Sequence, residues 1–224
     1  MQRNFQRPFV LPPGATEVVL IRHGSARHST PEQPLELIEG QSDPALTELG
    51  RDQALAVAER LSSAKVEAFF VTPLRRTQET ARPLAERLGI EPVVLPELRE
   101  VYLGDWEGQL NHRASSGDSL TREVFTAERW DVIPNAEPME EFSARVHRGM
   151  ELLVQAAGPD NTTLAVVHGG VISEACSQVT GASPFAFLYA ENGSLTRLMC
   201  LPSGKWTLLA FNDTAHLRGR NGHE

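Results

Sequence analysis

The chain has few cysteines and no long hydrophobic run, and both absences restrict where the protein is expected to work. Cys176 and Cys200 are the only cysteines among 224 residues, and their spacing gives neither a disulfide framework nor a CxxC metal site. We therefore expect buried or free thiols in a reducing compartment. No segment approaches the roughly 20 apolar residues of a membrane span, and prolines interrupt residues 1–14, where a signal peptide needs a continuous apolar run. We expect a cytoplasmic protein without a membrane partner.

Positive charge is also scarce, because 21 lysines and arginines are outnumbered by 29 aspartates and glutamates, which gives a formal net charge of −8. Binding to nucleic acid or to an anionic membrane relies on a broad positive surface, so neither partner is expected. A small anionic substrate is still compatible with this charge, since a few arginines can surround one pocket. The sequence also lacks a P-loop, an HExxH helix and an EF-hand loop, and we predict no metal and no cofactor.

Patterns typical of buried strands alternate with helical patterns along the chain. Strands are expected at 18–21, 66–71, 90–95 and 163–167, helices at 47–61, 72–88, 139–157 and 171–180, and a terminal hairpin at 195–201 and 206–211. This order predicts an α/β protein, a three-layer α/β/α sandwich with a mainly parallel central sheet. We expect residues 1–16 to form an N-terminal extension and residues 17–224 a single domain, with a long loop at 25–43. Residues 109–137 have no clear pattern beyond a helix within 120–130.

Two of the predicted strands end in a histidine that is followed by glycine. His23 follows the first strand and its terminal Arg22, and His168 follows the strand at 163–167. The carboxyl ends of parallel strands lie at one edge of a sheet, where open α/β sheets bind their ligands. A lone histidine at a strand end is more often a structural hydrogen-bonding group. Two histidines at equivalent strand ends favour a shared functional site.

The residue types near these strand ends suit phosphate chemistry. Arg22, Arg75 and Arg76 carry guanidinium groups that can bind two phosphate oxygens at once. A neutral imidazole can attack phosphorus, and nearby arginines lower its pKa and keep it unprotonated near neutral pH. Gly24 and Gly169 let the backbone approach a ligand closely. Without a metal, phosphoryl transfer needs cationic side chains to stabilise the transition state, and these arginines would supply them.

Several blocks in series resemble the histidine phosphatase superfamily (phosphoglycerate mutase-like, branch 1). The blocks that carry the resemblance are Arg22-His23-Gly24, the stretch Thr72–Ala81 (TPLRRTQETA), Leu98-Arg99-Glu100 with Gly104–Gly108 (GDWEG), and Val167–Gly170 (VHGG). The stretch Gly40–Gly50 and the terminal FNDTAHL of 211–217 are also similar to the family, so the resemblance covers most of the chain in the family's order. It implies the family's α/β fold and action on a small phosphorylated substrate.

The resemblance also implies roles for single residues. His23 would be the nucleophile that becomes phosphohistidine, and Arg22, Arg76 and His168 would bind the phosphoryl oxygens. Glu100 would protonate the leaving-group oxygen and later activate water, since a carboxylic acid beside a bound phosphate holds its proton more tightly. Arg75, next to Arg76, is expected on a solvated helix face. Glu107 stands at a family position that shapes the loop, and no catalytic role is expected for it.

The first loop departs from the family pattern. Ser25 and Ser29 stand where the family often has Glu or Gln and then Asn or Thr, and the loop is a few residues longer than usual. We therefore expect Ser25, Ser29 and Gly169 to bind substrate, and we include Arg27 and His28 as hypothetical substrate contacts.

Two reactions share these residues, and they differ in whether phosphate passes to water or to an organic acceptor. Mutases of the family carry a longer basic and aromatic segment before the second histidine, and residues 109–137 lack it although Arg113, Arg122 and Arg129 are scattered there. This favours a metal-independent phosphomonoesterase over phosphoglycerate mutase-type transfer. A non-catalytic module that binds phosphorylated ligands is the third alternative. The sequence fits several classes of phosphorylated substrate, and it is compatible with a homodimer without indicating one.

Overall fold

The computed structural model describes residues 9–29 and 35–219. The strands are β1 (Thr16–Arg22), β2 (Leu37–Ile38), β3 (Gln41–Ser42), β4 (Ala68–Val71), β5 (Val93–Val94), β6 (Thr162–Val167), β7 (Leu195–Cys200) and β8 (Trp206–Asp213). The α-helices are α1 (Glu48–Arg60), α2 (Arg75–Leu88), α3 (Leu110–Ser115), α4 (Ser119–Ala127), α5 (Met139–Ala157) and α6 (Gly169–Thr180). Short 3-10 helices lie at Pro96–Leu98, Gly104–Trp106, Trp130–Val132 and Ala215–Leu217.

A six-stranded sheet forms the centre of the molecule, with strand order β5-β4-β6-β1-β7-β8. The pairs β1–β6, β4–β6 and β4–β5 are parallel. Strand β7 pairs with β1 antiparallel, and β8 pairs with β7 antiparallel, so the terminal hairpin extends one side of the sheet. The mainly parallel sheet predicted from the sequence is confirmed.

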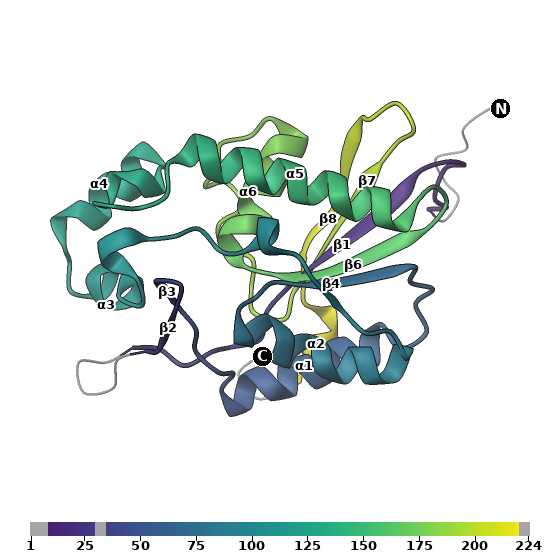
Figure 1. Cartoon of the computed structure of the whole chain (residues 1–224), viewed down its shortest axis with the longest axis horizontal. Coiled ribbons are helices and arrows are strands. Elements are labelled where there is room, and N and C mark those ends of the chain that lie inside the picture. The colour runs from purple at the N-terminus through teal and green to yellow at the C-terminus, as the bar shows by residue number, and fades with distance from the viewer. Residues whose placement is uncertain (1–8, 30–34, 220–224) are drawn as a thin grey trace.

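Helices cover both faces of this sheet, as Figure 1 shows. Alternate residues of β1 point to opposite faces, as strand geometry requires. Val19 and Ile21 belong to the core that α1 and α2 complete, whereas Val18 and Leu20 belong to the larger core beneath α5 and α6. Strands buried on both faces read as continuous apolar runs, which explains the unbroken hydrophobic pattern of the sequence there. The three-layer α/β/α architecture is therefore confirmed.

The helix boundaries follow local chemistry. The Thr47 side chain accepts a hydrogen bond from the Gly50 amide, as expected of an N-cap residue, and α1 begins at the next position. Gly181 adopts a left-handed conformation at the end of α6. Helix α2 begins at Arg75, later than the sequence suggests, and continues through Pro83. Near the N-terminus, β1 already includes Thr16, which the sequence places in the N-terminal extension.

The two segments that the sequence left least defined lie on the side of the molecule where β1 and β6 end. The described part of the 25–43 loop contains only the two-residue strands β2 and β3. Residues 109–137 form α3, α4 and a short 3-10 helix, and α4 begins where a helix was expected. Both segments are seen on the same side of the molecule in Figure 1. They supply walls to the cavities described below.

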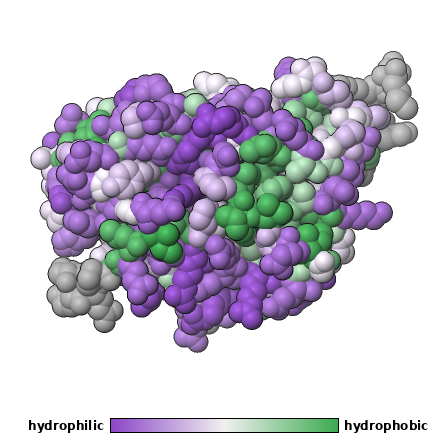
Figure 2. Space-filling model, viewed as in Figure 1, coloured by the Kyte–Doolittle hydropathy of each residue, from purple (hydrophilic) through white to green (hydrophobic). Residues whose placement is uncertain are grey.

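The surface shown in Figure 2 is predominantly hydrophilic, with hydrophobic residues gathered in separate patches. Exposed large hydrophobic side chains include Leu37 and Ile38 on the β2–β3 hairpin and Val93 and Val94 on the edge strand β5. None of the helices in the described ranges has both the length and the apolar character to cross a membrane.

Candidate active site

The two predicted histidines meet where β1 and β6 end. The parallel register places Arg22 opposite Val167, so the next residue of each strand, His23 or His168, leaves the sheet at the same edge. The two imidazole rings lie 5.3 Å apart between centroids. The pairing of two strands that lie far apart in the sequence, β1 and β6, therefore brings both side chains into one site.

His23 is held as a neutral imidazole by hydrogen bonds to both of its ring nitrogens. Its Nδ1 lies 2.8 Å from the carbonyl oxygen of Gly24, and because a carbonyl can only accept, Nδ1 carries the proton. The lone pair is then on Nε2, which lies 3.3 Å from Nε of Arg76. Burial lowers the pKa of His23 well below its usual value, and the positive charges of Arg76 and Arg22 lower it further. The side chain is thus an uncharged imidazole at neutral pH.

His168 lies behind His23 and is completely buried. Its Nε2 is 2.9 Å from the hydroxyl oxygen of Thr72, while its Nδ1 has no hydrogen-bond partner among the described residues. Burial lowers the pKa of His168 well below its usual value, with further lowering by Arg76 and His23. The ring is therefore neutral, and one buried nitrogen remains without a partner.

Two arginines face the same space. Arg76 donates from Nη1 to the carbonyl oxygen of Ser42 at 2.9 Å, and burial lowers the pKa of its guanidinium. Arg22 donates from Nη1 to the carbonyl of Ala190, and its buried Nε has no partner among the described residues. Buried polar groups in proteins are nearly always hydrogen-bonded. A phosphoryl oxygen in this space would give a partner to Nε of Arg22, which lines the cavity.

Glu100 approaches the site from the loop after the 3-10 helix at Pro96–Leu98. Its Oε1 accepts a hydrogen bond from its neighbour's amide, Val101 N, at 3.0 Å, and its Oε2 accepts one from Gly170 N at 3.2 Å. A Cβ atom at position 170 would lie 2.5 Å from Oε1 of Glu100. A glycine at the start of α6 is therefore needed for the carboxylate to occupy this place.

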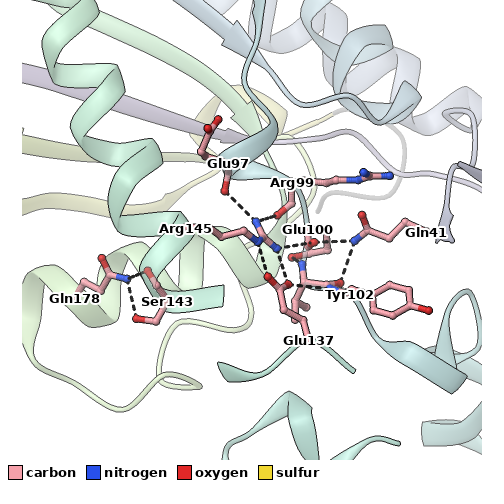
Figure 3. A network of polar contacts seen from close by, with 10 residues as sticks. Gln41, Glu97, Arg99, Glu100, Tyr102, Glu137, Ser143, Arg145 and Gln178 are labelled. Atoms are coloured by element: carbon pink, nitrogen blue, oxygen red, sulfur yellow. Dashed lines mark hydrogen bonds and ion pairs between the residues drawn. The ribbon is translucent and has the colours of Figure 1, made fainter. Parts of the chain in front are cut away.

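A network of polar contacts fixes the loop that carries Glu100 (Figure 3). Arg145 of α5 donates to the carbonyl oxygens of Glu97 and Glu100, each at 2.9 Å, and forms an ion pair with Glu137 at 2.6 Å. From the opposite side, Nε2 of Gln41 donates to the Glu100 carbonyl at 2.7 Å. Both partners of the ion pair are about five-sixths buried, with exposed side-chain fractions of 16% and 15%. The backbone at Glu100 is thus held from two elements.

Most of the predicted site residues line one cavity of about 240 Å³, and these are Arg22, His23, Ser25, Arg27, Ser29, Arg76 and Glu100. His168 lies beneath this cavity without lining it, and Gly169 lines a neighbouring cavity of about 590 Å³. The Arg27 side chain is exposed at the rim, as is His28, whose Nδ1 lies 3.0 Å from Nδ2 of Asn111. The structure therefore brings all the candidate residues to one region.

The sequence predicts no catalytic role for Arg75 or Glu107, and both have other partners, although Glu107 lines the same cavity as His23. Arg75 has 55% of its side chain exposed and pairs with Glu79 on the surface of α2. Glu107 accepts hydrogen bonds from the amides of Ser42 and Leu103, which ties β3 to the loop after Glu100.

Four residues that support the site were not evident from the sequence. Gln41, Thr72 and Arg145 act through the contacts above, and Nδ2 of Asn192 donates to the His23 carbonyl at 2.9 Å. Asn192 is followed by Gly193 with φ +78°, and an Asn-Gly dipeptide before a strand is a recognisable turn signal. Arg145 carries no such signal, because an arginine on a helix is usually solvated. Within residues 9–29 and 35–219, no three His, Cys, Asp or Glu side chains are grouped so that they could hold a metal ion.

Comparison with known proteins matches residues 18–214 to the model of the histidine phosphatase superfamily (branch 1). A Cronobacter sakazakii protein named "Probable phosphoglycerate mutase GpmB" is 30% identical over 209 residues, which cover 90% of this chain and 94% of that protein. A solved mycobacterial glucosyl-3-phosphoglycerate phosphatase is 27% identical with a TM-score of 0.71, covering 89% of this chain and 100% of that one. A phosphoglycerate mutase from Bacillus anthracis, at 21% identity, TM-score 0.75 and coverage of 92% and 96%, shares the fold.

Proposed function

The chain belongs to branch 1 of the histidine phosphatase superfamily, and we propose that it is a metal-independent phosphomonoesterase that forms a phosphohistidine on His23. One observation carries the proposal: the neutral imidazole of His23 lies in a cavity that is also lined by the guanidinium groups of Arg22 and Arg76, and the buried Nε of Arg22 has no partner among the described residues. A phosphoryl group is the ligand that meets a nucleophile and satisfies such donors together. Glu100 lies at the same cavity.

The reaction follows in two balanced steps. In the first, Nε2 of His23 forms a bond to phosphorus, the bond from phosphorus to the ester oxygen breaks, and protonated Glu100 gives its proton to that oxygen. The alcohol leaves. In the second, the Glu100 carboxylate takes a proton from water, the water oxygen bonds to phosphorus and the P–N bond breaks. Inorganic phosphate is released, and both side chains regain their starting states. Arg22, Arg76 and His168 bind the phosphoryl oxygens throughout.

Transfer to water is favoured over transfer to an organic acid because residues 109–137 bring no arginine to the site. Arg113 pairs with Asp118 at 3.0 Å and lies over the Trp106 ring, and Arg129 pairs with Asp131. The arginines of this segment line neither of the cavities at Glu100. A mutase must hold a second acidic group of its substrate during transfer, and cations suit that task. Phosphoglycerate mutase-type transfer is the runner-up, and the name of the Cronobacter relative is what favours it.

The test is release of inorganic phosphate from a panel of phosphorylated metabolites and p-nitrophenyl phosphate, with and without EDTA. We expect hydrolysis that survives EDTA and is lost in His23→Ala, while His147→Ala, an exposed histidine on α5, keeps it. Rapid quenching and intact-mass measurement should detect a phosphorylated protein in the parent alone. Equal activity of His23→Ala and the parent would refute the phosphohistidine, and loss with EDTA would refute metal independence.

A second assay separates the reactions. The enzyme is supplied with 3-phosphoglycerate and 2,3-bisphosphoglycerate, and 2-phosphoglycerate is measured beside inorganic phosphate. Formation of 2-phosphoglycerate faster than phosphate release would establish the mutase instead. Binding of phosphorylated ligands without either product would establish the non-catalytic module.

A further inference from the structure

A second cavity adjoins the catalytic one and is more than twice as large, at about 590 Å³ against about 240 Å³. The two cavities share Arg22 and Glu100 among their walls, so they meet at the phosphate site. His23 and Arg76 line only the smaller cavity. The larger cavity therefore opens on the side of the proposed acid and away from the nucleophile.

This position matches the path of a leaving group. In phosphoryl transfer the attacking and leaving atoms lie roughly in line on opposite sides of phosphorus. With Nε2 of His23 on one side, the ester oxygen must face away from it, toward Glu100, which protonates it. The organic part of the substrate then extends from that oxygen into the larger cavity.

The walls of the larger cavity are apolar over most of their extent. The large apolar side chains there come from separate segments of the chain and are Leu49, Leu103, Leu110, Phe125, Trp130, Leu188 and Tyr189. Tyr189 is 77% exposed and Phe125 is 38% exposed, so aromatic surface is available at the entrance. Cavities of this size and composition are typical of sites for small organic ligands.

Charge on these walls argues against an acidic leaving group. Apart from Arg22 and Glu100 at the phosphate site, the one charged residue among those lining the larger cavity is Glu191. A carboxylate or second phosphate there would be desolvated without a cation to pair with and would be repelled by Glu191. Arg27 and His28 line the smaller cavity and not the larger one.

We propose that the larger cavity is the leaving-group site and that it selects phosphate esters of uncharged alcohols with a bulky apolar or aromatic part. The inference rests on the proposed phosphomonoesterase activity and narrows its substrate class. Tyr189 would be a specificity-determining residue, because it places an aromatic ring at the open side of the cavity.

The experiment compares 2-phenylethyl phosphate with 3-phosphoglycerate, two esters of alkyl alcohols that differ in apolar area and charge. We expect kcat/KM for 2-phenylethyl phosphate to be higher by at least about tenfold, the scale set by burying one aromatic group. In Tyr189→Arg, a cation replaces the aromatic ring, and the ratio should fall at least about tenfold. Leu152→Arg adds the same charge on α5, where the side chain is 38% exposed and lines neither cavity, and should keep the parent ratio.

Two results would overturn the inference: a parent enzyme that prefers 3-phosphoglycerate, or a ratio that Tyr189→Arg leaves unchanged. Calorimetric titration of His23→Ala with both esters measures the same preference without turnover. If no ester, including p-nitrophenyl phosphate, is hydrolysed in a way that depends on His23, the proposed function is refuted instead. The affinities of the two esters measured by calorimetry would still show which of them the cavity prefers.

Discussion

Replacing Gly170 with alanine should displace the Glu100 carboxylate while the nucleophile and both arginines keep their places. The new Cβ atom would lie 2.5 Å from Oε1 of Glu100, and an ordinary contact needs at least 3.4 Å, so the carboxylate must move by about 0.9 Å (3.4 − 2.5). The Glu100 side chain is flexible, and alanine stabilises helices relative to glycine by up to about 1 kcal/mol. The variant should therefore fold as the parent does.

The effect should depend on the leaving group. A misplacement of about 1 Å can cost on the order of 100-fold in rate, and general acid catalysis contributes about 100-fold to 10,000-fold. We expect kcat/KM for glycerol 1-phosphate to fall about 100-fold in Gly170→Ala, because an alkoxide must be protonated as it leaves. For p-nitrophenyl phosphate the fall should stay below about tenfold, because nitrophenolate is a stable anion.

The assay measures kcat/KM because this constant includes phosphoryl transfer to His23 but not the later hydrolysis, in which Glu100 also takes part. Glu100→Gln should show the same dependence on the leaving group in a stronger form. Equal losses on both substrates would mean that the methyl group disturbs Arg22 or His23, and no loss on either would mean that Glu100 is not the acid. Both results would refute the reasoning.

Three further predictions follow from buried groups. Arg145→Lys should lower the free energy of unfolding by about 1–3 kcal/mol, measured by urea unfolding, and should reduce kcat/KM. The reason is that an ammonium group cannot replace the hydrogen bonds of the guanidinium to Glu137 and to the carbonyls around Glu100. Because burial and Arg76 hold the pKa values of His23 and His168 well below 6.5, the unfolded chain binds more protons than the folded one just below that pH. The free energy of unfolding, measured by urea titration, should therefore decrease as pH falls below about 6.5, by up to about 1.4 kcal/mol per histidine per pH unit. In His23→Asn this dependence on pH should be weaker. Burial raises the pKa of Cys176 to about 12, so a thiol reagent at pH 8 should modify it only after unfolding.

The same pattern in the sequence predicted the fold and the shared location of His23 and His168. Apolar runs of four to six residues, separated by helical periods, required a sheet covered on both faces, and the histidines stood where two of those runs ended. Parallel pairing of β1 with β6 then brought His23 and His168 together without any further information. The role of Glu100 was inferred from the family resemblance alone, because a single glutamate in a loop belongs to no hydrophobic or helical pattern that would indicate a function.

The parts of the site that could not be predicted depend on tertiary contacts. Arg145 lies on a helix whose apolar face was evident, but its burial arises from loop carbonyls more than 40 residues earlier in the chain. Gln41 is similar, since its partner is the backbone at Glu100. The larger cavity is lined by side chains from separate segments, and no local sequence pattern predicts that these side chains lie close together. A hydrogen bond to a backbone group far away in the sequence does not produce a periodic pattern from which it could be predicted.

The central position of β1 has a consequence for how the protein is made. Both of its neighbours, β6 and β7, lie in the last third of the chain, and Gly193 N donates to the Arg22 carbonyl at 3.0 Å. From Arg22 to Val167, the end of the first of these neighbours, the ribosome adds 145 residues (167 − 22), which takes about 7–29 s at about 5–20 residues per second. During that time β1, with its four consecutive apolar residues, has no partner in the sheet. The nascent chain must keep this strand from associating with other chains, and catalytic competence arises only when synthesis is nearly complete.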